Sequence, residues 1–99
     1  LVNPSTNAGK AHKGLPGYTY RRAPGEMWRS RFDMEKNVIV INNGHRDFVY
    51  AGKQKRRKLR YITRLFCKEL VRHNFPGLPV DELLERMIEL SLYTEEHLK

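Results

Sequence analysis

The sequence predicts a small α+β fold, a β-hairpin followed by two antiparallel helices with a flexible N-terminal arm. Three observations predict this fold. A stretch of alternating residues precedes the β-branched run Val38-Ile39-Val40-Ile41, two later stretches have helical periodicity, and the first segment is rich in glycine and proline. Because the chain has 99 residues, we expect one small domain at residues 26–99, with residues 1–25 as an arm or linker.

The predicted arm at residues 1–25 holds four of the seven glycines and three of the five prolines, but few aliphatic side chains. Such a segment buries too little apolar surface to offset the entropy lost on ordering it. The aromatic pair Tyr18 and Tyr20 is an exception, and it could anchor the arm on the domain or on another subunit.

The hairpin is predicted at residues 27–42. Trp28, Ser30 and Phe32 alternate with charged residues, which is the period of a strand with one buried face. Residues 33–37 supply polar turn chemistry, and Asn37 suits a left-handed backbone conformation. Residues 42–44, Asn-Asn-Gly, end the second strand in a turn.

Two helices are predicted to follow. At residues 53–74 the apolar Leu59, Ile62, Phe66 and Leu70 share one helical face, and Pro76-Gly77 ends the helix. The second helix is expected from near Pro79 to about Glu96, with Asp81 and Glu82 complementing the helix dipole. Its apolar face is predicted to comprise Val80, Leu83, Leu84, Met87, Ile88 and Ser91. The connection at residues 74–78 is short enough to make the helices antiparallel neighbours.

Charge is distributed unevenly along the chain. The net charge is +8, but residues 1–72 carry 17 basic and 5 acidic side chains, whereas residues 73–99 carry 2 basic and 6 acidic ones. On the first helix five cations recur every four residues, opposite the apolar face, and we call them the basic stripe: Arg56, Arg60, Arg64, Lys68 and Arg72. Together with Arg57 they are the predicted nucleic-acid or anion-binding residues, because such a row can track a phosphate backbone. The alternative is a solvated face that balances acids elsewhere, since no helix-turn-helix, zinc-finger or RNA-recognition signature is present.

Both helices also carry apolar residues outside their main apolar faces. Leu90, Leu92 and Tyr93 on the second helix, and Tyr61 and Val71 on the first, are in such positions. This extra apolar surface makes Leu90, Leu92 and Tyr93 candidate interface residues for dimerisation or docking on a parent domain. The alternative is that Leu90 and Leu92 cover the hairpin.

No catalytic residue, cofactor or metal site is predicted. The four histidines are far apart in the sequence, and the single Cys67 has no CxxC partner and is expected to be a packed thiol. The triplet His45-Arg46-Asp47 is similar to the catalytic loop of protein kinases, but Gly52 stands where that loop needs Asn. A cap formed by Asp47 or Asn43 is the favoured interpretation, and a fragment completing a parent's active site would make His45 and Asp47 the residues to test.

The compartment is expected to be the cytoplasm, because one cysteine suits a reducing environment. No apolar run approaches the roughly 18 residues that span a bilayer, so no membrane partner is expected. Position 1 is Leu and no basic-then-apolar leader follows it, which predicts that the chain starts inside a longer protein.

Five segments of the sequence resemble a known group of proteins: residues 28–33, 38–48, 58–65, 68–70 and 83–87. Together they resemble the C-terminal part of bacterial GHKL-type ATP-binding proteins, the group that includes gyrase B, MutL and histidine-kinase-like ATPases, over roughly residues 14–99. The Asn-bearing helix and Gly-rich lid of that group's ATP site are absent from this sequence, so no ATP-binding residue is carried over. The resemblance implies a tail module on a larger bacterial ATPase, and such tails often serve dimerisation or substrate engagement.

We therefore expect a non-catalytic interaction or dimerisation module whose partners are domains of the parent protein or a second copy of the chain. The alternative is a nucleic-acid-binding module in which the basic stripe contacts DNA or another polyanion.

Overall fold

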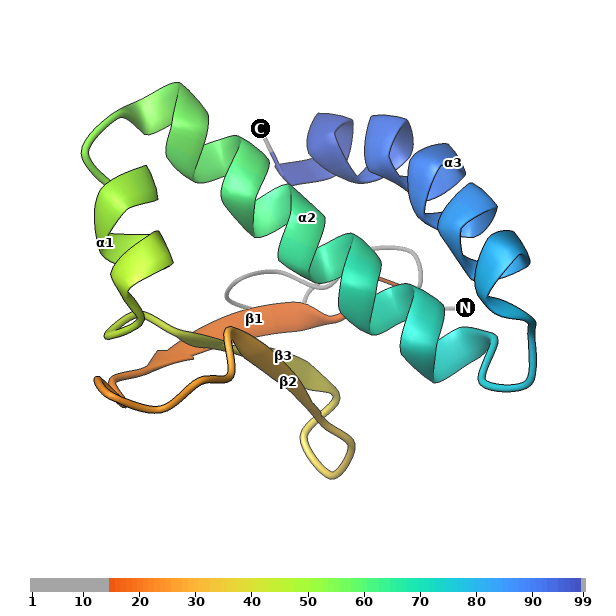
Figure 1. The fold of residues 1–99 in the computed structure, drawn as a ribbon, viewed down its shortest axis with the longest axis horizontal. Coiled ribbons are helices and arrows are strands. Elements are labelled where there is room, and N and C mark those ends of the chain that lie inside the picture. Colours follow the sequence, from red (N-terminus) through yellow and green to blue (C-terminus); the bar gives the residue numbers. More distant parts are fainter. Residues whose placement is uncertain (1–14, 99) are drawn as a thin grey trace. The chain divides into compact units, whose positions relative to one another are not determined.

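The computed structural model describes residues 15–98, which contain three strands and three helices (Figure 1). In chain order these are β1 (Gly17–Arg21), β2 (Ser30–Asp33), β3 (Val38–Asn42), α1 (Arg46–Ala51), α2 (Lys55–Asn74) and α3 (Val80–Leu98). The chain divides into two compact units, Leu1–Arg46 with the strands and Asp47–Lys99 with most of the helical residues. The predicted α+β class is confirmed.

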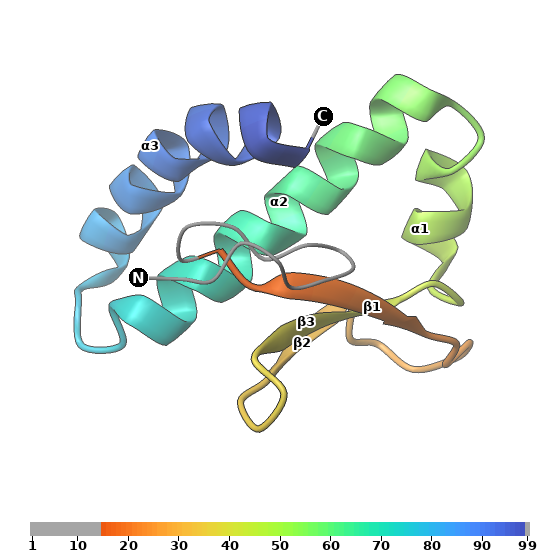
Figure 2. The ribbon, with the colours of Figure 1, turned by 180° about the vertical axis from the view of Figure 1, so that it is seen from behind.

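The predicted hairpin is confirmed as the antiparallel pair β2–β3, in which Ser30 pairs with Ile41. The turn between the two strands projects from the sheet (Figure 2). Asn37 in this turn has a φ of 54°, the left-handed conformation predicted for it, and the Asp33 carboxylate accepts a hydrogen bond from the Lys36 amide at 3.1 Å. Ile39 and Ile41 of β3 are fully buried, as expected of a central strand.

Strand β1 was not predicted, because its residues were assigned to the flexible arm. It lies parallel to β3, with Gly17 opposite Val38, and gives the sheet the order β1-β3-β2. Backbone groups of residues 17–21 therefore find partners in a strand that comes later in the chain, and Tyr18 packs edge-on against Tyr20 with ring centroids 5.8 Å apart. Residues 1–14 of the predicted arm lie outside the described residues.

Both predicted long helices are confirmed, with small shifts at their ends. Gln54 is the N-cap of α2, and its side-chain oxygen accepts a hydrogen bond from the Arg57 amide at 2.9 Å. The Phe75 amide donates to the Val71 carbonyl at 3.0 Å where α2 ends. Helix α3 then runs back alongside α2, so the two are antiparallel neighbours (Figure 1). The short α1, which ends with a hydrogen bond from the Gly52 amide to the Phe48 carbonyl at 2.8 Å, was not predicted.

The buried surface of α2 is wider than its sequence pattern predicts. Val71, which was assigned to the basic side, is buried, and Tyr61 is half-buried with its ring 6.2 Å from that of Phe48. For Tyr61 the neighbour is Phe48 of α1, a short helix whose contact the periodicity of α2 does not report. On α3, Thr94 is fully buried.

Candidate functional site

The basic stripe lies on the surface of α2. Arg56, Arg60, Arg64 and Arg72 are exposed and Lys68 is half-buried. A spacing of four residues corresponds to about 6 Å along a helix, so the stripe extends over about 24 Å. Within the described part of the chain, no carboxylate forms an ion pair with Arg56, Arg60 or Arg64.

The C-terminal end of the stripe is partly neutralised by a buried glutamate. Glu69 is 1% exposed, and its carboxylate lies 2.8 Å from Lys68 Nζ and 3.6 Å from Arg72 Nη1. A buried carboxylate is strongly unfavourable without cationic or hydrogen-bonding partners, and these two cations supply that compensation. Glu69 is the only acid in residues 53–72, which carry nine Lys or Arg side chains, but the sequence does not reveal that it is buried. The unbalanced positive charge of the basic stripe is therefore concentrated at Arg56, Arg60 and Arg64.

Arg57 does not belong to this surface, although it was predicted to bind anions with the stripe. Its guanidinium carbon lies 4.1 Å from the centre of the Tyr50 ring, and its Nη2 donates to the Tyr50 carbonyl at 3.1 Å. These contacts join the end of α1 to the start of α2. Arg57 therefore has a structural role, because its guanidinium is engaged with the neighbouring helix.

Helix α3 exposes four aliphatic side chains that recur every four residues, and we call them the apolar row: Val80, Leu84, Ile88 and Leu92. They are 67%, 53%, 64% and 80% exposed, respectively. The prediction placed the first three on the packed face of the helix, and this is wrong. Residues four apart differ in direction by 40° around a helix. Each step of the row therefore points further from the face that carries the half-buried Leu83 and Met87. Of the predicted interface residues, Leu92 and Tyr93 are exposed and Leu90 is half-buried.

A row of acids follows the apolar row along α3, one residue later at each turn. This acidic row consists of Asp81, Glu85 and Glu89, all of them exposed. Glu89 forms an intrahelical ion pair with Arg86 at 3.1 Å. Among residues 15–98, Asp81 and Glu85 have no ion-pair partner.

A cleft of about 240 Å³ lies between α2 and α3, lined by Arg60, Thr63, Arg64, Ser91 and Glu95. The Thr63 hydroxyl donates to the Leu59 carbonyl at 2.8 Å and the Ser91 hydroxyl donates to the Ile88 carbonyl at 2.7 Å. The guanidinium groups of Arg60 and Arg64 are therefore the hydrogen-bond donors of this cleft that remain available to a ligand. This chemistry suits a carboxylate or phosphate oxygen placed at the cleft mouth.

The thiol of Cys67 lies inside the helical unit and is 1% exposed. Burial raises its pKa, and the neighbouring Thr94 hydroxyl offsets part of that rise. A neutral, enclosed thiol is a poor nucleophile, so this residue packs rather than reacts.

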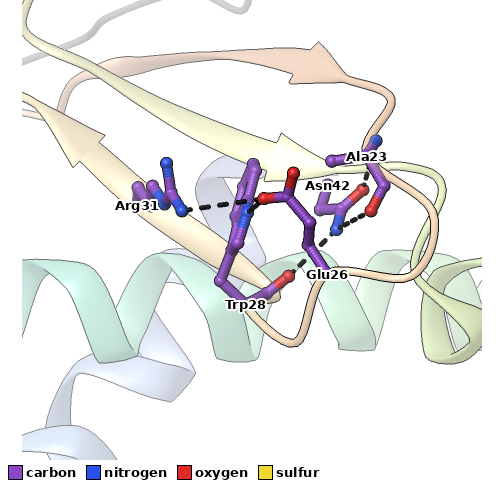
Figure 3. Close-up of polar contacts among 5 residues, drawn as sticks. All are labelled: Ala23, Glu26, Trp28, Arg31 and Asn42. Carbon is purple, nitrogen blue, oxygen red and sulfur yellow. Dashed lines mark hydrogen bonds and ion pairs between the residues drawn. The ribbon is translucent and has the colours of Figure 1, made fainter.

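The strand unit holds a polar network around Asn42 (Figure 3). The Gly44 amide donates to Asn42 Oδ1 at 3.0 Å, whereas the side-chain oxygen of Asn43, one of the two predicted caps, has no hydrogen-bond partner among the described residues. Nearby, Trp28 Nε1 donates to Glu26 Oε1 at 2.5 Å, and the Arg31 guanidinium stacks 4.1 Å from the Trp28 ring centre.

His45, which was named as a residue to test if the chain completes an active site of a parent protein, is buried. In the part of the chain that is described, no three His, Cys, Asp or Glu side chains come together as a metal site.

Comparison of the chain with protein-family models, curated proteins and solved structures finds no match. The resemblance to GHKL-type proteins therefore stays a prediction. No helix within residues 15–98 is long and apolar enough to cross a membrane.

Proposed function

We propose that this chain is a non-catalytic interaction or dimerisation module of a larger, cytoplasmic, ATPase-like protein, and that the α2–α3 face is its interaction surface. The observation that carries the proposal is the apolar row of α3, whose four aliphatic side chains are between 53% and 80% exposed. Contiguous apolar surface of this kind is typical of sites that bind another protein, since hydrophobic burial is gained only on association.

The chemistry next to the row indicates what kind of partner fits. The cleft beside it presents Arg60 and Arg64, which have no ion pair among the described residues. A partner that buries the row and satisfies these arginines must be apolar on one side and acidic on the adjacent side. An acidic amphipathic helix meets both requirements.

The experiment is a titration of the isotope-labelled chain with a designed helical peptide that carries leucine and glutamate rows, followed by NMR. Amide signals of α2 and α3 are expected to shift, and Leu84→Ser/Ile88→Ser is expected to abolish the shifts while the helical circular dichroism is retained. A peptide with lysine in place of glutamate is the matched control and should bind at least about tenfold more weakly. If neither peptide perturbs α3, the proposed function is wrong.

A second candidate function is nucleic-acid binding by the basic stripe, and the three exposed arginines Arg56, Arg60 and Arg64 favour it. Binding to labelled duplex DNA should then fall steeply with salt, because phosphate contacts release counterions. Arg60→Glu/Arg64→Glu should remove both the binding and the salt dependence.

The matched control for DNA binding is Arg21→Glu/Arg22→Glu, an equal charge change at exposed positions of the strand unit. If both double variants weaken binding equally, or if DNA binds no better than heparin, the stripe is not a nucleic-acid site.

A further inference from the structure

We propose that the strand unit binds a small phosphomonoester in a pocket beside the Asn42 network. The pocket has a volume of about 390 Å³ and is lined by residues 25–27, Arg29 and residues 44–46. Ligand pockets of proteins begin at about 300 Å³, so this one suits a small molecule. All of its lining residues belong to the unit Leu1–Arg46, and none comes from α2 or α3. The site is therefore independent of the proposed interaction surface.

Both walls of the pocket are fastened to the same residue, the fully buried Asn42. Its Nδ2 donates to the Trp28 carbonyl at 3.1 Å (Figure 3), and its Oδ1 accepts from the Gly44 amide at 3.0 Å. Its backbone amide donates to the Arg29 carbonyl at 3.0 Å, and its carbonyl accepts from the His45 amide at 3.2 Å. A site whose walls are held in this way before binding loses little conformational entropy when a ligand enters.

One wall is a tight turn that leaves the pocket open. The Glu26 amide donates to the Ala23 carbonyl at 3.3 Å, with Pro24 and Gly25 between them. Gly25 has a φ of 89°, and proline followed by glycine with positive φ is the pattern of a type II turn. A Cβ at Gly25 would meet no atom within 4 Å, so the backbone here borders open space and not packed side chains.

The side chains that line the pocket favour an anion with more than one charge. Arg29 and Arg46 contribute two guanidinium groups, and His45 contributes an imidazole. A guanidinium has more N–H donors than one neighbour uses, so each can serve a ligand oxygen while it keeps its contacts within the chain. A phosphomonoester has a charge of about −1.5 to −2 at pH 7 and three acceptor oxygens. It therefore matches two guanidinium groups better than a carboxylate or a phosphodiester does.

The one acid of the pocket, Glu26, is engaged by residues that do not line it. Its Oε1 accepts a hydrogen bond from Trp28 Nε1 at 2.5 Å and lies 3.9 Å from Arg31 Nη2 (Figure 3). These two donors compensate part of the carboxylate charge, so the pocket as a whole stays positive.

The organic part of the ligand has an apolar contact in Met27. This side chain lines the same pocket and is 86% exposed, so it gains burial only when a ligand covers it. A methionine side chain is flexible and adapts to the shape of a ring or an alkyl chain. The pocket thus combines a phosphate-binding part, formed by the two arginines, with an apolar part formed by Met27.

The experiment is an NMR titration of the isotope-labelled chain with phenyl phosphate, which carries both a phosphomonoester and an apolar ring. Amide shifts are expected at residues 25–29 and 44–46. Phenyl sulfate has the same shape but one negative charge, and it should bind at least about tenfold more weakly because it makes fewer charge-assisted contacts.

Two exposed methionines supply a matched pair of variants. Met27→Glu places a carboxylate at the pocket without disturbing packed residues, and it should weaken binding of phenyl phosphate at least about fivefold. Met34→Glu makes the same charge change in the turn between β2 and β3, outside the pocket, and should leave binding nearly unchanged.

A second pair removes positive charge. Arg29→Gln/Arg46→Gln should abolish the shifts, whereas Arg21→Gln/Arg22→Gln, the same loss of charge at other exposed positions of the strand unit, should not. If the first of these variants fails to fold by circular dichroism, the methionine pair decides.

Four results would overturn the inference: no shift at residues 25–29 and 44–46 with millimolar phenyl phosphate, equal binding of phenyl sulfate, equal effects of Met27→Glu and Met34→Glu, or shifts that Arg60→Glu/Arg64→Glu removes. The last result would move the phosphate to the basic stripe. None of the four bears on the helical peptide and the Leu84→Ser/Ile88→Ser variant, so the proposed function is tested separately.

Discussion

The side-chain amide of Asn42 pairs with both backbone polar groups of Ala23: Nδ2 donates to the Ala23 carbonyl and Oδ1 accepts from the Ala23 amide, each at 2.9 Å (Figure 3). Nδ2 also donates to the Trp28 carbonyl at 3.1 Å. The side chain thus satisfies backbone groups in the loop between β1 and β2 that the strand ladder does not reach.

Replacing this amide is expected to destabilise the strand unit. Asn42→Ala leaves buried backbone groups without partners and should lower the free energy of unfolding by about 3 kcal/mol. Urea denaturation followed by the fluorescence of Trp28, the only tryptophan, measures the effect. Asn43→Ala is the control, because the Asn43 side-chain oxygen has no hydrogen-bond partner among the described residues, and it should cost less than about 1 kcal/mol. Equal losses would contradict the role assigned to Asn42.

A methyl group at Gly44 is expected to be destabilising because of its neighbours. A Cβ there would lie 2.9 Å from Pro24 N and 3.1 Å from Ala23 N, and neither backbone atom can move aside cheaply. Gly44→Ala should therefore cost about 1–3 kcal/mol in thermal unfolding. At Gly77 a Cβ would meet no atom within 4 Å, so Gly77→Ala should be neutral or slightly stabilising. A melting temperature of Gly44→Ala at or above that of Gly77→Ala would show that the loop at Pro24 is looser than described.

The start of α2 offers a stabilising substitution. Gln54 occupies the N-cap with φ −141° and ψ 128°, and its side chain accepts from the Arg57 amide. Aspartate is a better N-cap than glutamine, and its charge interacts favourably with the helix dipole. Gln54→Asp is expected to raise the free energy of unfolding by about 0.5–1 kcal/mol, whereas Gln54→Ala should lower it. Helical circular dichroism during denaturation tests both, and a loss of stability on Gln54→Asp would count against the cap.

The buried thiol of Cys67 is expected to make the stability of the fold depend on pH in the alkaline range. Its pKa in the folded chain is raised above the usual 9.0, chiefly by burial. The unfolded chain therefore releases the thiol proton first as pH rises, binds fewer protons than the folded chain, and is favoured. The free energy of unfolding should fall as pH increases above about 9, and that of the Cys67→Ala variant should fall less steeply. Tyr20, whose pKa is also raised from 10.0, adds to the decline at higher pH in both proteins. Identical pH profiles between pH 9 and pH 10 would refute the contribution of the thiol.

Local pattern in the sequence was sufficient to predict β2, β3, α2 and α3. It was insufficient for β1, because residues 17–21 pair with a strand that follows an intervening loop and the whole of β2. It was also insufficient for α1, whose six residues make fewer than two helical turns and show no periodicity. Elements that depend on partners distant in the sequence, or that are too short to repeat, leave no local signal.

The candidate surface could be predicted in part. The four-residue repeat of Arg56, Arg60 and Arg64 marks an exposed row, and the structure places all three on the surface. Burial of Glu69 was not predictable, because an acid between two cations resembles any solvated helix position. The exposure of Leu84 and Ile88 was not predicted, because an i, i+4 spacing is found both on a packed helix face and in a row that turns gradually out to solvent.

The central position of β3 in the order β1-β3-β2 constrains the sequence of folding events. Residues 34–37 alone separate β2 from β3, so that hairpin closes a short loop, whereas β1 must wait for a completed β3 edge before its parallel ladder can form. Strand β1 is therefore expected to be the last strand to join the sheet. Until β1 joins, the edge of β3 is unpaired and is a template that an extended segment of another molecule can occupy, so we expect strand exchange between molecules to use this edge.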